Sequence, residues 1–130
     1  MVYKTYSEAM TWDVALDDAF AEEFQVLPAD VQDELLARAQ VLAQFGPSLG
    51  RPQVDTLKGS THANMKELRF DAADGVWRVA FAFDPKRAAI LLVAGDKAGV
   101  SQKKFYKQLI RKADERFTAH LARLRKKEDR

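Results

Sequence analysis

The chain has 130 residues, of which 47% are hydrophobic and 31% are charged, and its formal net charge is +2. This composition excludes a disordered, collagen-like or disulfide-scaffold protein and is typical of one globular domain that buries roughly 70% of its unfolded surface. The sequence contains no cysteine, which excludes disulfides, thiolate metal sites and cysteine nucleophiles.

The start of the chain does not have the pattern of a targeting segment. It shows neither the basic residues nor the apolar stretch of a signal peptide, and no run approaches the roughly 18 apolar residues of a membrane span. We therefore expect a cytoplasmic protein that does not enter a membrane.

Charge is distributed unevenly along the sequence. Residues 1–50 hold two basic and nine acidic side chains, whereas residues 51–130 hold nineteen basic and ten acidic ones, so the two parts carry −7 and +9. Clustered Lys and Arg bind phosphates and displace their counterions, which favours a polyanionic partner for the C-terminal part. The alternative is that a lysine-rich last helix simply exposes a solvated face.

The N-terminal part predicts one strand and two helices. Residues 11–17 alternate bulky apolar residues with polar or small ones, which is typical of a half-buried strand. Apolar residues then recur at helical spacing up to Pro28, and a second helix is expected from an Asp30 cap to Phe45. Acidic residues occupy the outer faces of both helices.

The second half predicts three strands and a last helix. A turn-rich loop at 46–52 precedes them, and the expected strands are 64–70, 76–83 and 88–94, of which the last is apolar almost throughout and should be central. Short connections at 72–75 and 84–87 favour an antiparallel meander. The final helix is expected to start at a Ser101 cap, with a break near Asp114.

This order of elements is β-α-α-β-β-β-α and predicts an α+β fold. Two N-terminal helices and a C-terminal helix would surround a small, mainly antiparallel sheet. We expect a single domain over residues 11–127, with an N-terminal extension at 1–10 and a tail at 128–130.

Alternation along strand 76–83 divides its side chains between two faces. The bulky residues share one face, which we expect to face the core: Trp77, Val79, Phe81 and Phe83. Arg78, Ala80 and Ala82 share the other face. Small alanines beside an arginine on an open sheet face would leave room for a ligand.

The same alternation in 64–70 places Glu67 and Arg69 on the face that carries Arg78. Two guanidinium groups on one face predict a bidentate phosphate site. The alternative is an ion pair, in which Glu67 or a nearby aspartate neutralises these arginines on a solvated surface.

Several further residues are candidates for the same site. Lys97 follows the buried strand in a glycine-containing loop and can reach over the sheet face, although it could equally be an ordinary loop lysine. Asp55 and Lys58 come just before the first meander strand and are placed to overhang that face. Lys66 lies on the core side unless the strand bulges. Tyr106 is either a packing residue of the last helix or a proton donor or stacking platform.

The histidines give no metal motif. His62 and His120 lack the spacing of a zinc site, and His120 is most simply a residue on a helix face. The sequence also lacks the glycine-rich phosphate-binding motifs and the GxSxG motif. We therefore expect no metal and no cofactor.

One succession of motifs is more specific than any single piece. LGRPQVDTLKGS, NMKELRF, WRVAFAFDP and AILLVAGDKAG, followed by a basic helix with a tyrosine, resemble the phage-derived, HigB-like branch of the RelE toxin superfamily over about Trp12 to Leu124. The resemblance implies a β-α-α-β-β-β-α toxin that cleaves mRNA, usually in the ribosomal A site. It also implies a monomeric toxin within a complex with its cognate antitoxin, commonly a helix-turn-helix, HigA-like protein.

The resemblance further implies which residues act. The ELR motif indicates Glu67 and Arg69, the WR motif Arg78, the GDK motif Lys97, and a looser match indicates Tyr106. Residues expected to bind the RNA are Asp55, Lys58, Lys66, Lys103 and Lys104.

Cleavage would use the 2′-hydroxyl of the RNA itself, without a metal, and needs a base, an acid and positive charge. The chain lacks the histidine that some relatives have at the end of the last strand. The base therefore remains either Glu67 or Asp55, and the acid either Lys97 or Tyr106.

Two rival functions remain open at this point. The chain could be an RNA- or DNA-binding module without catalysis, or a protein-interaction domain whose acidic helices and apolar groove bind a partner. The variant Arg69→Ala separates the first rival from an endoribonuclease, because only catalysis would be lost while RNA binding persists.

Overall fold

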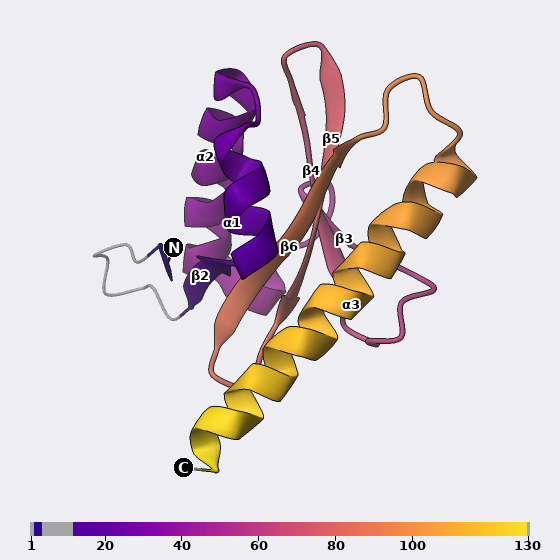
Figure 1. The fold of residues 1–130 in the computed structure, drawn as a ribbon. Coiled ribbons are helices and arrows are strands. Elements are labelled where there is room, and N and C mark those ends of the chain that lie inside the picture. Colours follow the sequence, from indigo (N-terminus) through magenta and orange to yellow (C-terminus); the bar gives the residue numbers. More distant parts are fainter. Residues whose placement is uncertain (1, 4–11, 130) are drawn as a thin grey trace.

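A computed structural model of the chain describes residues 2–3 and 12–129 (Figure 1). One six-stranded sheet runs in the order β1-β2-β6-β5-β4-β3. The β2 and β6 strands pair in parallel, and all the other neighbours are antiparallel. The elements are β1 (Val2–Tyr3), β2 (Asp13–Leu16), α1 (Asp18–Gln25), α2 (Ala29–Phe45), a short 3-10 helix (Gly46–Ser48), β3 (Val54–Thr56), β4 (Lys66–Ala72), β5 (Gly75–Phe83), β6 (Ala88–Asp96) and α3 (Gln102–Glu128).

This architecture confirms the predicted α+β class and the order of its main elements. Two short strands, β1 and β3, were not predicted, because two or three residues are too few to show a period of two. The predicted extension, residues 1–10, lies mostly outside the described residues, although Val2 pairs with Ala15 of β2 and Tyr3 pairs with Val14. The domain boundaries stay a prediction.

Helices cover both faces of the sheet, with α1 and α2 on one face and α3 on the other (Figure 1). The first core, under α1 and α2, includes Phe20, Leu35, Leu42, Val79, Phe81 and Leu91. The second core, under α3, includes Met65, Ala80, Leu92, Phe105, Leu109 and Ala113. The central strand β6 contributes to both cores, which explains why its sequence is apolar almost throughout.

The second core corrects one expectation about the sheet face that carries Arg78. Ala80 and Ala82 are 0% and 2% exposed, because α3 packs directly over them. Their small side chains make room for a helix and not for a ligand. A site on this face is therefore confined to the region beside the first turns of α3.

The beginnings of α1 and α2 differ in how they are capped. The Asp17 carboxylate accepts hydrogen bonds from the backbone N–H groups of Ala19 and Phe20, at 3.1 and 3.3 Å, and so caps α1. The predicted Asp30 cap of α2 is wrong, because the capping position is Pro28 and Asp30 lies inside the first turn. In that position its negative charge still interacts favourably with the positive N-terminal end of the helix dipole.

The last helix starts where predicted and is continuous. Ser101 caps it by accepting a hydrogen bond from the Lys104 N–H at 3.5 Å. The predicted break near Asp114 does not occur. The Asp114 carboxylate points away from the helix and accepts hydrogen bonds from the Ser60 hydroxyl and from the Thr61 N–H, the latter at 3.0 Å. Asp114 therefore anchors the loop at Ser60 and Thr61 and does not interrupt the helix.

Three residues on one side of α3 attach its C-terminal half to the rest of the domain. Arg116 makes two hydrogen bonds to Glu23 of α1, at 2.8 and 2.7 Å, and a third to the Leu92 carbonyl at 2.7 Å. Arg123 approaches Asp17 at 3.4 Å. Arg116, His120 and Arg123 are spaced three and four residues apart, so they share a helix face.

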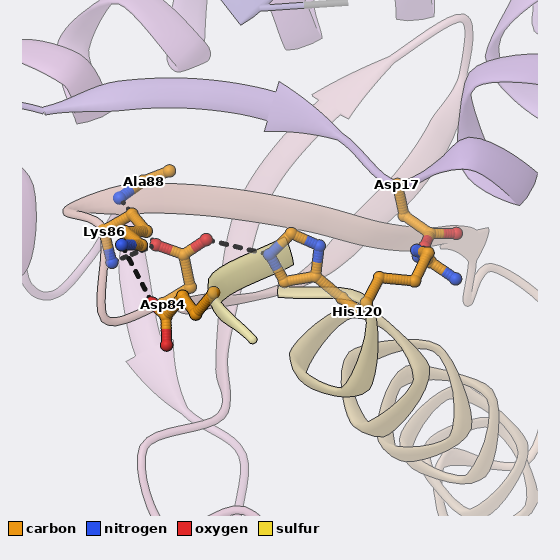
Figure 2. Close-up of polar contacts among 7 residues, drawn as sticks. Asp17, Asp84, Lys86, Ala88 and His120 are labelled. Atoms are coloured by element: carbon orange, nitrogen blue, oxygen red, sulfur yellow. Dashed lines mark hydrogen bonds and ion pairs between the residues drawn. The ribbon is translucent and has the colours of Figure 1, made fainter. Parts of the chain in front are cut away.

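His120 is the middle member of this group, and Figure 2 shows its ring pointing at the Asp84 carboxylate. The His120 Nε2 lies 2.8 Å from Asp84 Oδ2, while Asp84 Oδ1 accepts the Lys86 and Ala88 N–H groups in the β5–β6 turn, at 2.8 and 3.1 Å. His120 is thus more than a residue on a helix face: it ties α3 to this turn.

No helix in the described ranges has both the length and the apolar character that a membrane span requires.

Candidate functional site

A cavity of about 570 Å³ lies between β3, β4, the loop after β6 and the first turns of α3. Six residues singled out from the sequence line it: Asp55, Lys58, Glu67, Arg69, Lys97 and Tyr106. They come from separate segments of the chain, and the paired strands and the docked helix bring them together.

Glu67 is the buried carboxylate of this cavity. It is only 6% exposed, and its Oε1 accepts a hydrogen bond from the Tyr106 hydroxyl at 2.8 Å. The same Oε1 lies 3.7 Å from Arg78 Nε. Burial raises the pKa of Glu67, because the loss of hydration outweighs the opposing effects of the Tyr106 hydrogen bond and of Arg78 and Arg69.

Arg78 stands behind Glu67 and not in the lining of this cavity. Its Nη1 donates to the Trp77 carbonyl at 2.9 Å, and the residue is 6% exposed. Its Nε atom has no hydrogen-bond partner among the described residues. Arg78 lies directly opposite Arg69 in the β4–β5 register, so the two guanidinium groups are neighbours of like charge.

Arg69 reaches the cavity from β4 and faces Asp55 of β3. Its Nη1 lies 4.0 Å from Asp55 Oδ2, and Arg51 Nε approaches the same oxygen at 3.6 Å. Ion pairs of the kind considered from the sequence are therefore present. The pair between Glu67 and Arg78, however, is buried and does not lie on a solvated surface.

Lys97 and Tyr106 form the opposite side of the cavity. The Lys97 ammonium lies 5.9 Å from the centre of the Tyr106 ring. Burial lowers the pKa of Lys97, and the nearby cations Arg78 and Arg69 lower it further. Burial and the hydrogen bond to Glu67 raise the pKa of Tyr106. The pKa values of Lys97 and Tyr106, which normally lie far above neutral pH, are thus shifted in opposite directions.

A glycine allows α3 to approach β6 next to this site. A Cβ atom on Gly95 would meet Phe105 Cε1 at 2.8 Å, closer than real side chains come. The loop that follows is held by the Lys97 N–H, which donates to the Val76 carbonyl at 2.8 Å. Gly95, near the end of β6, therefore permits the close approach of α3 beside the site.

The other predicted RNA-binding lysines lie outside the cavity lining. Lys66 is on the face of β4 that carries Leu68, and the irregularity in the sheet falls between β5 and β6, so the alternation of β4 holds. Lys103 and Lys104 are exposed in the first turn of α3 beside Gln102, which does line the cavity.

Sequence reasoning missed some members of the cavity, including Arg51 and Gln102. Arg51 belongs to an irregular loop, where no periodicity indicates the direction of a side chain. Gln102 is the first residue of α3, and its place depends on how that helix docks. Its position directly after the Ser101 cap was the one available signal.

Comparison with known proteins places the chain in a family. Residues 22–118 match the family described as "Phage derived protein Gp49-like". The chain belongs to this Gp49-like family. The matched segment contains all six predicted residues of the cavity.

Two relatives of this Gp49-like protein come from Mycobacterium tuberculosis. It is 46% identical over 97 residues to a protein named putative toxin HigB2, covering 74% of this chain and 48% of the relative. It is also 46% identical over 99 residues to putative toxin HigB3, covering 76% of this chain and 84% of the relative. The chain thus spans about half the length of HigB2 and most of HigB3, and these relatives confirm the resemblance to the HigB-like branch.

A solved structure shows the same fold. The free form of the Escherichia coli toxin RelE, in a variant with two arginines replaced by alanine, superposes with a TM-score of 0.52 and 10% sequence identity. The match covers 78% of this chain and 94% of RelE. At this identity the comparison supports the fold and does not assign any residue's role.

Proposed function

We propose that this Gp49-like protein is the toxin of a type II toxin–antitoxin system and acts as a ribosome-dependent mRNA endoribonuclease that inhibits translation. The observation that carries the proposal is the cavity in which the buried Glu67–Tyr106 pair lies beside Arg69 and Lys97. The names of the two mycobacterial relatives, both called putative toxins, support the toxin part of the proposal.

The proposed reaction needs no metal. The 2′-hydroxyl of the RNA attacks the adjacent phosphorus, a base removes the hydroxyl proton, and an acid protonates the departing 5′-oxygen. The products are a 2′,3′-cyclic phosphate and a 5′-hydroxyl, so no water and no electrons enter the step. The phosphorane that forms during the attack gains negative charge, so positively charged side chains are needed beside it.

Glu67 is the residue that fits the base best. Its raised pKa makes the carboxylate a stronger base near neutral pH than an ordinary glutamate. Both of its described contacts converge on Oε1, so we assign proton removal to Oε2. Asp55, the other candidate base, lies between two arginines and serves better to orient Arg69.

Lys97 fits the acid, and Arg69 fits the phosphate contact. The lowered pKa of Lys97 brings its ammonium closer to the pH range in which an acid can release its proton. Tyr106 has a raised pKa and a hydrogen bond to Glu67, so it holds the base and is a poorer proton donor. Arg78 supports Glu67 from behind, and Arg69 stabilises the phosphorane.

The charge distribution supports a large polyanionic partner. Residues 51–130 carry a net charge of +9, which suits binding to mRNA and the ribosome. A site with so few groups of ideal pKa should act slowly on free RNA, and the ribosomal A site would position the strand. A cognate antitoxin, of the helix-turn-helix, HigA-like type, would bind the monomeric toxin in the cytoplasm.

Mapping of cleavage sites by primer extension in cells tests the proposal. Wild-type protein should produce discrete cuts in translated mRNA and arrest growth, while Arg69→Ala should produce neither and still bind RNA. Arg125→Ala removes one exposed positive charge from the end of α3 and serves as the matched control. The proposal fails if wild-type expression leaves mRNA intact. It is also wrong about the metal if EDTA stops slow cleavage of free RNA.

A further inference from the structure

A second cavity adjoins the first at the edge of the sheet. Its volume is about 430 Å³, and its lining includes Arg38, Arg69, Arg78 and Asp71. Arg69 lines both cavities, so they meet at this side chain. We propose that the second cavity binds the phosphodiester next to the scissile one, with Arg38 as a contact to the RNA. This inference rests on the proposed function, because it assumes an RNA strand in the first cavity.

The charges around the second cavity match an anion. Three guanidinium groups, from α2, β4 and β5, line it together with the single carboxylate of Asp71. A guanidinium presents a planar fork of N–H donors that fits phosphate oxygens in pairs. Each guanidinium also has a carboxylate nearby, Glu34 for Arg38, Asp55 for Arg69 and Glu67 for Arg78. Arg69 and Arg78 lie 4.0 and 3.7 Å from theirs, which leaves their N–H groups able to take a phosphate as a further partner.

Arg78 supplies an independent observation that points to a ligand. Its side chain is 7% exposed and lines this cavity, and its Nε has no hydrogen-bond partner in the ranges that the structure describes. A buried N–H without an acceptor is unfavourable, and such groups in folded proteins call for an explanation. Glu67 Oε1, the ion-pair partner of this Nε, lies 3.7 Å away, which is beyond hydrogen-bond distance, so the guanidinium beside the cavity is incompletely satisfied by the protein.

Arg38 is free enough to change partners. Its only described ion pair is with Glu34 one helical turn earlier, and its Nε and Nη2 both lie 2.9 Å from the same oxygen, Glu34 Oε1. The two side chains are 33% and 37% exposed. Exposed pairs of this kind contribute little to stability, so Arg38 can exchange the carboxylate for a phosphate.

The sheet edge offers a continuous path from one cavity to the other. The β3 strand covers β4 only as far as the pair Val54 and Leu68. Arg69 comes next, and its N–H donates to the Gln53 carbonyl at 2.9 Å. Pro52 and Gln53 line the second cavity beyond this point. An RNA strand leaving the first cavity can therefore cross the edge of the sheet at Arg69 and reach α2.

Binding of short RNAs of two lengths tests the inference. The probes are a fluorescent hexanucleotide taken from a mapped cleavage site and the fluorescent dinucleotide that spans its cleaved linkage. Both lack the 2′-hydroxyl at that linkage. Arg38→Ala should weaken binding of the hexanucleotide about tenfold and leave the dinucleotide unchanged. The plot of log K against log salt for the hexanucleotide should become shallower, with its negative slope reduced in magnitude by about 0.7.

Two control variants separate this role from general effects. Arg111→Ala removes an exposed charge from α3 and should leave the difference between the two probes intact. Glu34→Ala breaks the ion pair while keeping Arg38, and should bind the hexanucleotide at least as tightly as wild type. The inference is overturned if Arg111→Ala or Glu34→Ala reproduces the loss, or if Arg38→Ala weakens both probes equally. If Arg69→Ala abolishes cleavage while Arg38→Ala binds like wild type, the proposed function stands and only this inference fails.

Discussion

The hydroxyl of Tyr106 can be removed almost without changing the shape of the site, which makes Tyr106→Phe a sharp test of the Glu67 assignment. The ring would keep its edge-to-face contact with Phe105, at 5.1 Å between centroids, and its place beneath Lys97. The hydroxyl that donates to Glu67 Oε1 at 2.8 Å would be lost, together with its weaker interaction with Arg78.

The size of the effect follows from that one hydrogen bond. A bond to a charged group contributes about 1.5–3 kcal/mol, so ionised Glu67 would be destabilised by about 2 kcal/mol and the Tm would fall by roughly 5–10 °C. The Tyr106 bond opposes the effect of burial and lowers the pKa of Glu67, so its loss raises that pKa further. The loss of stability should therefore be larger at neutral pH than at acid pH, where Glu67 is protonated in both proteins.

The pH dependence of cleavage is the decisive assay. If Glu67 is the base, the acidic limb of the pH–rate profile reports its ionisation, and this limb should move to higher pH in Tyr106→Phe. Activity should fall on the acidic side of the profile and recover as the pH rises. Thr118→Val removes another hydroxyl from α3, one that lies 2.9 Å from His62 Nε2, and should leave the profile in place. A limb that stays fixed, with an equal loss at every pH, would refute the assignment and make Tyr106 the proton donor.

Three further predictions concern the same site and its support. Glu67→Gln should lower cleavage by about 10²–10⁴-fold. Because a raised carboxyl pKa makes the folded state less stable as the pH rises through it, the same variant should unfold at higher denaturant near pH 7 and lose this advantage at low pH; an unchanged difference across the pH range would contradict the raised pKa. Gly95→Ala should destabilise the fold by about 1–3 kcal/mol in urea unfolding, because of the contact with Phe105, whereas Gly50→Ala, whose added Cβ would meet no atom within 4 Å, should not. Arg116→Met should destabilise by about 2–3 kcal/mol through the lost bonds to Glu23 and the Leu92 carbonyl, while Arg125→Met in the exposed last turn should have little effect; equal midpoints for these two variants would mean that the attachment of α3 does not depend on Arg116.

Alternation along β4 and β5 was sufficient to place the main side chains on one face of the sheet. A strand exposes successive residues to opposite sides, so Glu67, Arg69 and Arg78 could be assigned to one face without any tertiary information. The Ser101 cap of α3 was equally readable, because a serine hydroxyl that accepts a backbone N–H is a local interaction. The Asp30 prediction failed, since an acidic residue in the first turn and a true cap have similar local signals.

The depth of each side chain could not be predicted in this way. A period of two tells which side of the sheet a residue faces, but it does not tell what covers that side. The docking of α3 turned the expected open face at Ala80 and Ala82 into a core, and left Arg78 buried behind Glu67. Arg38 was not a candidate at all, because it belongs to a helix on the opposite face and meets Arg69 only around the edge of the sheet.

The sequence by itself determined the class of fold, the side of the sheet that carries the charged residues, and the identity of most residues in the cavity. These features depend on local periodicity and on motifs that are close together along the chain. Only the tertiary structure decided which carboxylate is buried, which hydroxyl it binds, and how two cavities join at Arg69. These features depend on the packing of α2, α3 and the sheet edge against one another, and the pKa shifts of Glu67, Lys97 and Tyr106 follow from that packing.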